Sequence, residues 1–239
     1  MLYHVHFRAF STLPTILSSI SHFHCRSYFS SPTISRSVTR ALAGAKRIFG
    51  SPSTPRRIIT KSMLASLFTL TLRPDTSFIV VRTVWRIFME FYGLLRFSEV
   101  SNLTFSDISW TDVGFDIFIS KSKTDQTRKG FWVAIASQPS SPACPVAFTR
   151  KYLSLLPYNS GFIMPSVTNS VPDSTSLLKY NTALRDLRSV LRLIGIDPQG
   201  YGEHSGRRGG TTAAANKGAT LDELMIQGRW RSESMPTLA

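Results

Sequence analysis

The sequence predicts a mainly α-helical fold with a small antiparallel β-hairpin, an α+β arrangement. Apolar residues recur at helical spacing through most of the 239 residues. The segments 115–120 and 130–136 instead alternate with the two-residue period of strands, on either side of the polar loop 121–130. Hydrophobic residues make up 42% of the chain and charged residues 18%, a globular composition that can build a sizeable core.

Two helices are expected at the front of the chain, over 13–29 and 33–50, because both segments place apolar residues at helical spacing. Two helices alone bury too little apolar surface to be stable, so this piece must dock on something or belong to a larger domain. The second helix is amphipathic, and its apolar side carries Val38, Leu42, Ala45, Ile48 and Phe49.

The clearest break in the chain is "GSPSTPRR", residues 50–57, where two prolines, a glycine and small polar residues end any helix. We therefore divide the chain into a helical segment over 1–50, a linker over 51–57 and a larger domain over 58–239.

The larger domain is expected to begin with two helices. Thr60 or Ser62 can cap the first, over 61–72. The second, over 78–97, is apolar nearly all round, which is typical of a helix buried at the centre of a domain. A short helix and a turn follow over 98–110 and lead into the strand pair. The sequence thus predicts a mostly helical domain with one small sheet.

Helices complete the domain after the hairpin. Three are expected over 144–156, 176–196 and 205–218. The third ends at Gly218, and a last short helix has Thr220 as its cap and Gly228 as its stop. The helix over 176–196 has its apolar residues at helical spacing: Leu177, Leu184, Leu187, Leu191 and Ile194.

The chain carries a net charge of +14 with a pI of about 10.4, so an anionic partner is expected, nucleic acid before a membrane surface. Residues 1–74 hold ten Lys/Arg and no acidic residue, whereas 75–239 hold eighteen against fourteen. A basic front segment fits a phosphate backbone. A mitochondrial transit segment over 1–31 is the alternative, because such peptides are also rich in Arg and Ser and poor in acidic residues.

Membrane, metal and disulfide chemistry are not expected. The most apolar stretch breaks at Arg73 and Pro74, which is too short for a transmembrane span. Cys25 and Cys144 are far apart and outside any Cys/His cluster, so we expect reduced, buried thiols. Two H-x-H pairs lack a nearby carboxylate and predict no metal site: His4, His6, His22 and His24.

Arginines stand out in three places. In "GLLRFSEVSNLTFSDI", Arg96 precedes Glu99 by three residues, a spacing at which the carboxylate can orient the guanidinium. In "HSGRRGG", His204 and Arg207 lie one helical turn apart. The third place is "GRWR" near the end of the chain. Each of these alone is also typical of a surface arginine or a simple ion pair.

Together these stretches resemble the catalytic domain of the tyrosine recombinases, the phage-integrase family. The first resembles the arginine-bearing helix and turn, and "HSGRRGGTTAAANKG" with "LDELMIQGRW" resembles the His-x-x-Arg box and the Gly-His/Trp box. The wording is closest to the recombinases of eukaryotic Crypton-like and DIRS-like mobile elements. The resemblance covers residues 58–238, and more weakly 12–50. It implies an integrase-like catalytic domain preceded by a partial all-α core-binding domain.

The resemblance assigns roles to single residues. Arg96 and Arg207 match the two family arginines, whose planar guanidinium groups each hold two phosphate oxygens without a metal. His204 matches the family histidine, which serves proton transfer and phosphate contact. Lys123 matches the lysine that protonates the departing 5′-oxygen, with Lys121 as the alternative.

The Gly-His/Trp box has Arg229 where many members have His, followed by Trp230. Either can donate a hydrogen bond to phosphate, and Arg229 is favoured by its position. Glu99 would orient Arg96. Four residues are expected to contact the DNA backbone: Lys121, Arg208, Arg56 and Arg57.

The family nucleophile is a tyrosine that forms a 3′-phosphotyrosyl link. Its position corresponds here to Leu238 or Ala239, neither of which has a hydroxyl group. Pro236 is also poorly placed for the helix that should carry the tyrosine. With only two front helices as well, the resemblance implies a chain that is truncated at both ends and is not expected to cleave DNA.

The resemblance therefore implies a DNA-binding protein of DNA recombination and integration. Its partner would be double-stranded DNA, with no cofactor, no metal and no membrane, and with a homo-oligomer on DNA if the chain is intact. The alternative is a non-catalytic DNA-binding remnant of a mobile-element recombinase. A nuclear location is expected, with a mitochondrial one as the alternative.

Overall fold

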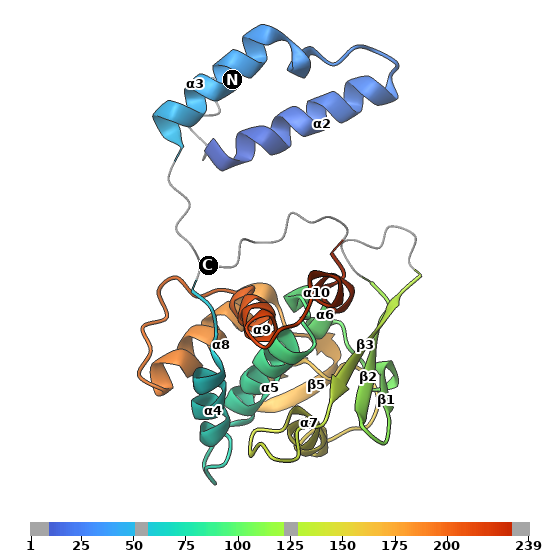
Figure 1. Ribbon diagram of the computed structural model, residues 1–239, viewed down its shortest axis with the longest axis vertical. Coiled ribbons are helices and arrows are strands. Elements are labelled where there is room, and N and C mark those ends of the chain that lie inside the picture. Colours follow the sequence, from blue (N-terminus) through green and yellow to red (C-terminus); the bar gives the residue numbers. More distant parts are fainter. Residues whose placement is uncertain (1–9, 51–56, 122–128, 231–239) are drawn as a thin grey trace. The chain divides into compact units, whose positions relative to one another are not determined.

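The structure is a computed structural model that describes residues 10–50, 57–121 and 129–230 (Figure 1). The chain divides into two compact units, Met1–Thr54 and Pro55–Ala239. The division falls within the segment that the sequence marks as a linker, most of which lies outside the described residues.

The smaller unit contains two α-helices with short 3-10 turns before each. Its elements are η1 (Phe10–Thr12), α2 (Leu13–Arg26), η2 (Pro32–Ile34) and α3 (Arg36–Phe49). Leu13 and Ala45 are its buried apolar residues among those described, packed against Phe10 and Leu42. Ile48 and Phe49 are exposed, so the predicted apolar side of the second helix is only partly covered. The expectation that two helices form a poor core fits this small cluster.

The larger unit is built around α5 (Phe78–Tyr92), which is buried from Val81 to Phe91. Figure 1 shows it in the middle of this unit, and it contacts α4, α7, α8 and α9. The central position predicted from its all-round apolar sequence is confirmed. The other helices of this unit are α4 (Lys61–Leu70), α6 (Phe97–Ser101), η3 (Phe105–Asp107), α7 (Pro145–Ser154), α8 (Tyr180–Leu193), α9 (Ser205–Ala215) and α10 (Leu221–Gly228).

Helix α5 ends five residues earlier than the sequence predicts. Gly93 caps it, and Leu94 takes a left-handed conformation with φ of 47°, which no residue of a continuing helix adopts. The chain then turns into α6. Two predicted caps are confirmed: Thr60 accepts a hydrogen bond from the Met63 backbone at 3.2 Å, and Thr220 forms a capping box on α10.

The predicted hairpin is confirmed and gains a third strand. Strands β1 (Ile108–Trp110), β2 (Gly114–Ile119) and β3 (Phe131–Ala136) form an antiparallel sheet in that order. Phe115 pairs with Ile135 and Ile117 with Val133, and all four side chains are buried. The two-residue alternation read from the sequence therefore marks the face that covers the core.

A second, two-stranded sheet was not predicted. Strands β4 (Pro165–Thr168) and β5 (Val171–Leu177) pair antiparallel, with Asn169 and Ser170 both in the left-handed conformation at the turn. The expectations of one small sheet and of a helix starting at residue 176 were therefore wrong. Leu177 belongs to the strand, because the backbone hydrogen bonds of this segment are taken by β4.

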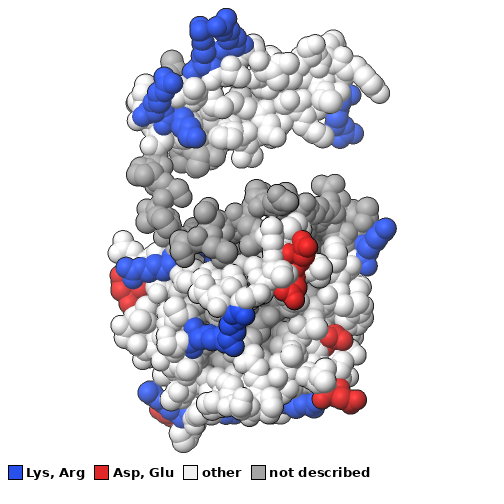
Figure 2. Space-filling model, viewed as in Figure 1, with Lys and Arg blue, Asp and Glu red and all other residues white. Residues whose placement is uncertain are grey.

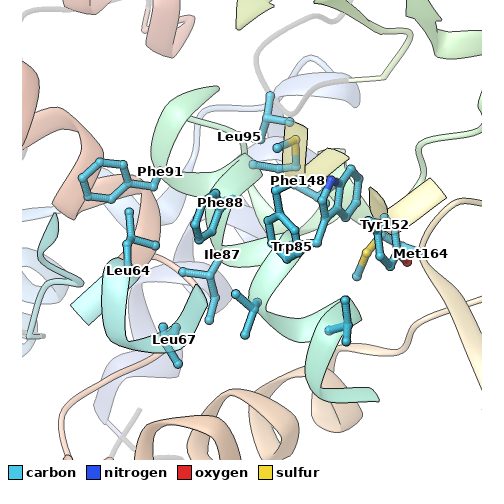
Figure 3. Packing of buried hydrophobic residues seen from close by; sticks show 14 of the residues in the cluster. Leu64, Leu67, Trp85, Ile87, Phe88, Phe91, Leu95, Phe148, Tyr152 and Met164 are labelled. Carbon is cyan, nitrogen blue, oxygen red and sulfur yellow. The ribbon is translucent and has the colours of Figure 1, made fainter. Parts of the chain in front are cut away.

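The core of the larger unit is rich in aromatic side chains (Figure 3). Trp85 stacks on Tyr152 with ring centroids 4.5 Å apart, and its indole N–H donates to Thr149 Oγ1 at 3.0 Å. Phe88 meets Phe148 edge to face at 5.0 Å. The polar tips of the large rings are thus hydrogen-bonded inside the core, as burial requires.

Cys144 is buried and Cys25 is exposed, and neither forms a disulfide. The prediction that both thiols are buried is confirmed for Cys144 and was wrong for Cys25. It lies near the end of α2 in the smaller unit, whose core is too small to cover it. None of the helices in the described part of the chain is long and apolar enough to cross a membrane.

Candidate phosphate-binding site

Three separate elements bring arginine side chains onto one carboxylate, that of Glu99 in α6. Arg96, just before α6, donates from Nη1 to Glu99 Oε1 at 2.7 Å. Arg229, just after α10, donates from Nη2 to Glu99 Oε2 at 2.7 Å. Arg207 of α9 places Nη1 3.9 Å from the same oxygen. Residues 96, 207 and 229, far apart in sequence, therefore form one cluster, which we call the arginine cluster.

Glu99 is held by the way α6 begins. Arg96 is the N-cap residue of this helix, and its backbone N–H donates to Glu99 Oε2 at 2.7 Å. The same carboxylate thus caps the helix and binds the guanidinium of Arg96. Glu99 is only 2% exposed, so its position is fixed before any ligand arrives.

The backbone carbonyl of Leu94 is a second anchor, and the sequence analysis did not predict it. It accepts hydrogen bonds from Arg207 Nη1 and, at 3.0 Å, from Arg229 Nη2. The left-handed conformation of Leu94 is unfavourable for a bulky residue, and residues held this way cluster at functional sites. The only sequence signal for it is the preceding Gly93.

Trp230 packs against the arginine cluster. The guanidinium carbon of Arg207 lies 4.5 Å from the centre of its ring, a cation–π contact, and Arg207 also donates to the carbonyl of Gly228. A side chain at position 228 would collide with the Trp230 ring, since a Cβ there would lie 1.9 Å from it. This explains why a glycine precedes the arginine and tryptophan in "GRW".

Arg229 is buried and turned inward. It takes the left-handed conformation at the end of α10, with φ of 55°, and donates from Nη1 to the carbonyl of Gln227 at 2.8 Å. Together with its bonds to Glu99 and Leu94, this directs the guanidinium into the protein. The Gly-His/Trp box offered two candidates, Arg229 and Trp230. Arg229 binds Glu99 and the Leu94 carbonyl and so stabilises the arginine cluster, while Trp230 contacts Arg207.

The arginine cluster carries more positive than negative charge. Three guanidinium groups share the Glu99 carboxylate, a formal balance of +2 among these four side chains. Burial, with repulsion from Arg96 and Arg229, lowers the pKa of Arg207 to about 9. Burial alone would raise the pKa of Glu99, but Arg229 and the hydrogen bonds from Arg96 outweigh it and lower that pKa. An anion bound here would relieve the repulsion.

His204 is the N-cap residue of α9, one turn before Arg207, and it is exposed. Arg208 follows Arg207 and is half-buried. The first turn of a helix presents backbone N–H groups and the positive end of the helix dipole, both of which favour an anion. The start of α9 thus adds an exposed imidazole to a region that is already positive.

The glycines of "HSGRRGG" let α9 lie directly on its neighbours. A Cβ at Gly209 would be 1.9 Å from the carbonyl oxygen of Ile59, and one at Gly210 would be 2.0 Å from that of Phe91. No larger residue fits at either position without moving backbone. This close approach sets the depth of Arg207 beside Leu94, at the end of α5.

The remaining predicted residues lie elsewhere or outside the described part. Lys121 is exposed at the end of β2, and Arg57 packs near the ring of Tyr201 at 6.0 Å. Lys123, Arg56 and the expected tyrosine position near Leu238 lie outside the described residues. No group of three or more His, Cys, Asp or Glu that could hold a metal ion occurs among residues 10–50, 57–121 and 129–230.

This fold, mostly helical with small antiparallel sheets, is that of a tyrosine recombinase catalytic domain. The Tn1549 transposon integrase in complex with circular intermediate DNA is similar in structure, with a TM-score of 0.65 and 11% identity, over 97% of this chain and 75% of that one. The XerH site-specific recombinase bound to difH substrate gives a TM-score of 0.55 and 13% identity, over 94% of this chain and 64% of that one.

Sequence likeness points the same way. The chain is 28% identical over 200 residues to an integrase/recombinase xerD homolog of Selenomonas ruminantium. The match covers 84% of this chain and 57% of that protein, so the chain spans little more than half of that relative. No family-level sequence profile matches the chain. In both fold and sequence, the chain is therefore similar to tyrosine recombinases and integrases.

Proposed function

We propose that this chain binds double-stranded DNA and belongs to DNA recombination and integration. The observation that carries the proposal is the arginine cluster, in which Arg96, Arg207 and Arg229 surround the single carboxylate of Glu99. An excess of guanidinium groups held in fixed positions suits a phosphodiester, whose oxygens match the planar fork of arginine. Similar structures solved with DNA support the choice of partner.

In this proposal each residue has a separate task. Arg96 and Arg207 hold the scissile phosphate and stabilise the charge that develops on it. His204, exposed at the start of α9, contacts the phosphate and transfers a proton. Lys123, or Lys121 in its place, is the proposed proton donor to the 5′-oxygen. This proton is used only when a nucleophile supplied from elsewhere attacks the phosphate, because Leu238 and Ala239 have no hydroxyl group. Lys121, Arg208, Arg56 and Arg57 contact the backbone of the DNA.

In this proposal, Arg229 and Trp230 of the Gly-His/Trp box have different structural roles. The guanidinium of Arg229 is engaged by Glu99, Leu94 and Gln227, which supports a role in bracing the arginine cluster. Trp230 stacks on Arg207 and keeps that guanidinium in one orientation. The motif wording "HSGRRGG" and "GRW" further supports an origin in a Crypton-like or DIRS-like mobile element.

The test is a comparison of two conservative variants. Arg207→Lys keeps the charge but loses the fork that binds two oxygens, so affinity for a duplex should fall by about tenfold, or about 1.4 kcal/mol. Arg150→Lys is the matched control, because Arg150 lies on α7 over the ring of Trp110, at 3.9 Å, outside the arginine cluster. Equal losses in both variants, measured by fluorescence anisotropy, would count against a phosphate site.

A second assay separates binding from cleavage. The 239-residue polypeptide should form no covalent adduct with a nicked suicide duplex, because neither Leu238 nor Ala239 offers a hydroxyl group. An adduct resistant to denaturing gel electrophoresis would show that another residue acts as nucleophile. Cross-linking on DNA in the same samples would report the homo-oligomer, which we propose forms there if the chain is intact.

We also propose a nuclear location, with import into mitochondria as the alternative. The basic front of the chain suits either destination. A fluorescent fusion, imaged with and without residues 1–31, distinguishes them. A mitochondrial signal that depends on these residues would replace the nuclear proposal.

A further inference from the structure

A second group of buried charges lies beneath α9, separate from the arginine cluster. Arg86 of α5 donates from Nη1 to Glu90 Oε1 at 2.8 Å, and the same nitrogen bonds Oε2 of Glu203. The three side chains are between 0% and 2% exposed. We call these residues the buried triad. Charged groups at this depth are costly to bury and persist only with good partners, so their arrangement is well defined.

Arg86 connects several elements of the larger unit. Its Nη2 donates to the carbonyl of Ala183 in α8 at 3.2 Å, and its guanidinium carbon lies 5.8 Å from the ring centre of Phe97 in α6. Through Glu203 it also holds the segment that leads into α9. One guanidinium therefore links α5, α6, α8 and the start of α9.

Glu203 directly precedes His204 in the chain. The carboxylate of Glu203 is bound inside the protein, while the imidazole of His204 faces solvent. The following residues are held as well: the Ile59 backbone N–H donates to the Ser205 carbonyl at 3.0 Å. Gly206 rests on the triad, since a Cβ there would lie 2.8 Å from Glu90 Oε2. The first turn of α9 is thus attached on its inner side on both sides of His204.

We propose that Glu203 and Arg86 are positioning residues that fix His204 at the start of α9. The proposal rests on the phosphate-binding function proposed above for His204, because positioning matters only if that imidazole meets a ligand. A side chain adjacent in sequence to an anchored carboxylate has little freedom to shift its backbone, so the imidazole starts from one defined point. Neither anchor touches the phosphate.

The charge balance of the region adds a second property. The neighbouring pair, Arg82 with Asp186 at 2.7 Å, is buried next to the triad, so the buried groups are two arginines and three carboxylates. The exposed Arg185 also reaches Asp186, at 3.3 Å, from the protein surface. Among the buried groups alone, one carboxylate is in excess. Burial raises the pKa of Glu90 to about 8, opposed by Arg86 and reinforced by Glu203, and burial likewise raises the pKa of Glu203.

The raised pKa values of these two carboxyl groups favour an additional proton in the triad at neutral pH. Glu203 Oε1 has no hydrogen-bond partner among the described residues, so this carboxyl group is not fully paired by Arg86. The groups facing the triad are Arg82 and Asp186, with the Tyr152 hydroxyl next to Arg82 and the exposed Arg185 paired with Asp186. When pH rises through about 8 the proton is lost, and the added negative charge weakens the attachment of α9 beside His204.

The histidine signals in NMR spectra test this directly. The chain has five histidines, and four of them precede residue 25, so His204 can be assigned with one His204→Gln variant. Glu203→Gln keeps the size of the side chain and removes its charge. We expect it to shift the His204 imidazole signals and its pKa, and to weaken duplex binding on the order of tenfold. Asp107→Asn is the control, because this half-buried carboxylate caps η3 and, among the described residues, has no hydrogen bond or ion pair to the triad, so the His204 signals should stay in place.

A measurement on the unmodified protein keeps the inference testable if a variant does not fold. In a pH titration, the His204 signals should show a second inflection near pH 8 that the other four histidines lack. Glu90→Gln should remove this inflection. A single His204 titration, unchanged by Glu203→Gln in a folded variant, would overturn the inference. These spectra are recorded without DNA. If the wild-type protein fails to bind a duplex, that result contradicts the proposed function but leaves the positioning of His204 to be judged from the spectra.

Discussion

Glu99 shows how much of the site depends on one side chain. Its two oxygens bind Arg96 and Arg229 at 2.7 Å and lie near Arg207, and one of them also caps α6. Removing its charge would leave buried guanidinium groups without a counter-charge. An unbalanced charge in the interior costs more than the lost hydrogen bonds themselves.

The variant Glu99→Ala should therefore be strongly destabilising. We expect the free energy of unfolding to fall by about 3–5 kcal/mol, the usual cost of breaking a buried ion pair from one side. Urea denaturation followed by circular dichroism measures it. Asp112→Asn, at an exposed position, is the control and should change stability by less than about 0.5 kcal/mol. If the two variants behave alike, Glu99 does not hold the arginine cluster together.

At the scale of elements, α9 is the helix on which both charged groups converge. It carries Arg207 toward the arginine cluster and begins beside Glu203 of the buried triad. Its glycines bring it against the backbone of α5 and of the segment at Ile59. Close packing at this interface, more than helix propensity, decides where Arg207 lies, since glycine within a helix is intrinsically unfavourable.

Replacing one of these glycines should separate the helices. In Gly210→Ala the new methyl group would lie 2.0 Å from the Phe91 carbonyl oxygen, so backbone must move. We expect a loss of about 1–3 kcal/mol in the free energy of unfolding, together with weaker duplex binding. Gly44→Ala on α3 is the control, because nothing lies within 4 Å of the new methyl group. This variant should raise the helicity of the smaller unit. If it lowers the free energy of unfolding as much as Gly210→Ala does, the packing argument is contradicted.

For the whole molecule, the net charge of +14 is distributed unevenly. Figure 2 shows only basic charged side chains on the visible face of the smaller unit, whereas the larger unit shows both signs interspersed. For the proposed DNA partner, we therefore expect a general electrostatic attraction from the smaller unit and a defined contact from the arginine cluster. Duplex binding should weaken steeply with salt, and a flat salt dependence in a titration would argue against a backbone partner.

Stability of the whole molecule should vary with pH in two opposite ways. The lowered pKa of Glu99 means that its contribution is present above its ordinary value of 4.5 and is lost as pH falls below it. The raised pKa of Glu90 means that its contribution is present below its ordinary value of 4.5 and is lost as pH rises from there through about 8. The thermal unfolding temperature should therefore be highest at mildly acidic pH. Glu90→Gln should flatten the decline between about pH 5 and pH 8, and an unchanged decline would show that another group causes it.

Patterns within single elements were predictable. The all-round apolar segment marked α5, the alternation marked β2 and β3, and Thr60 and Thr220 were recognised as caps because these signals are local. The β4–β5 hairpin was missed, since short polar strands pair through backbone groups that leave little trace in the side chains. The arginines of the site could be named in advance only from their resemblance to a family.

The sequence by itself determined the helical class, the hairpin and the basic charge, because residue spacing and charge are properties of the chain alone. Only the tertiary structure decided that Arg96, Arg207 and Arg229 share Glu99, that the Leu94 carbonyl joins them, and that Arg86 is bound to Glu203. Those contacts join residues up to 135 positions apart. These contacts depend on the direct packing of α9 on α5, which the glycines of α9 allow. Local helix propensity does not encode this geometry.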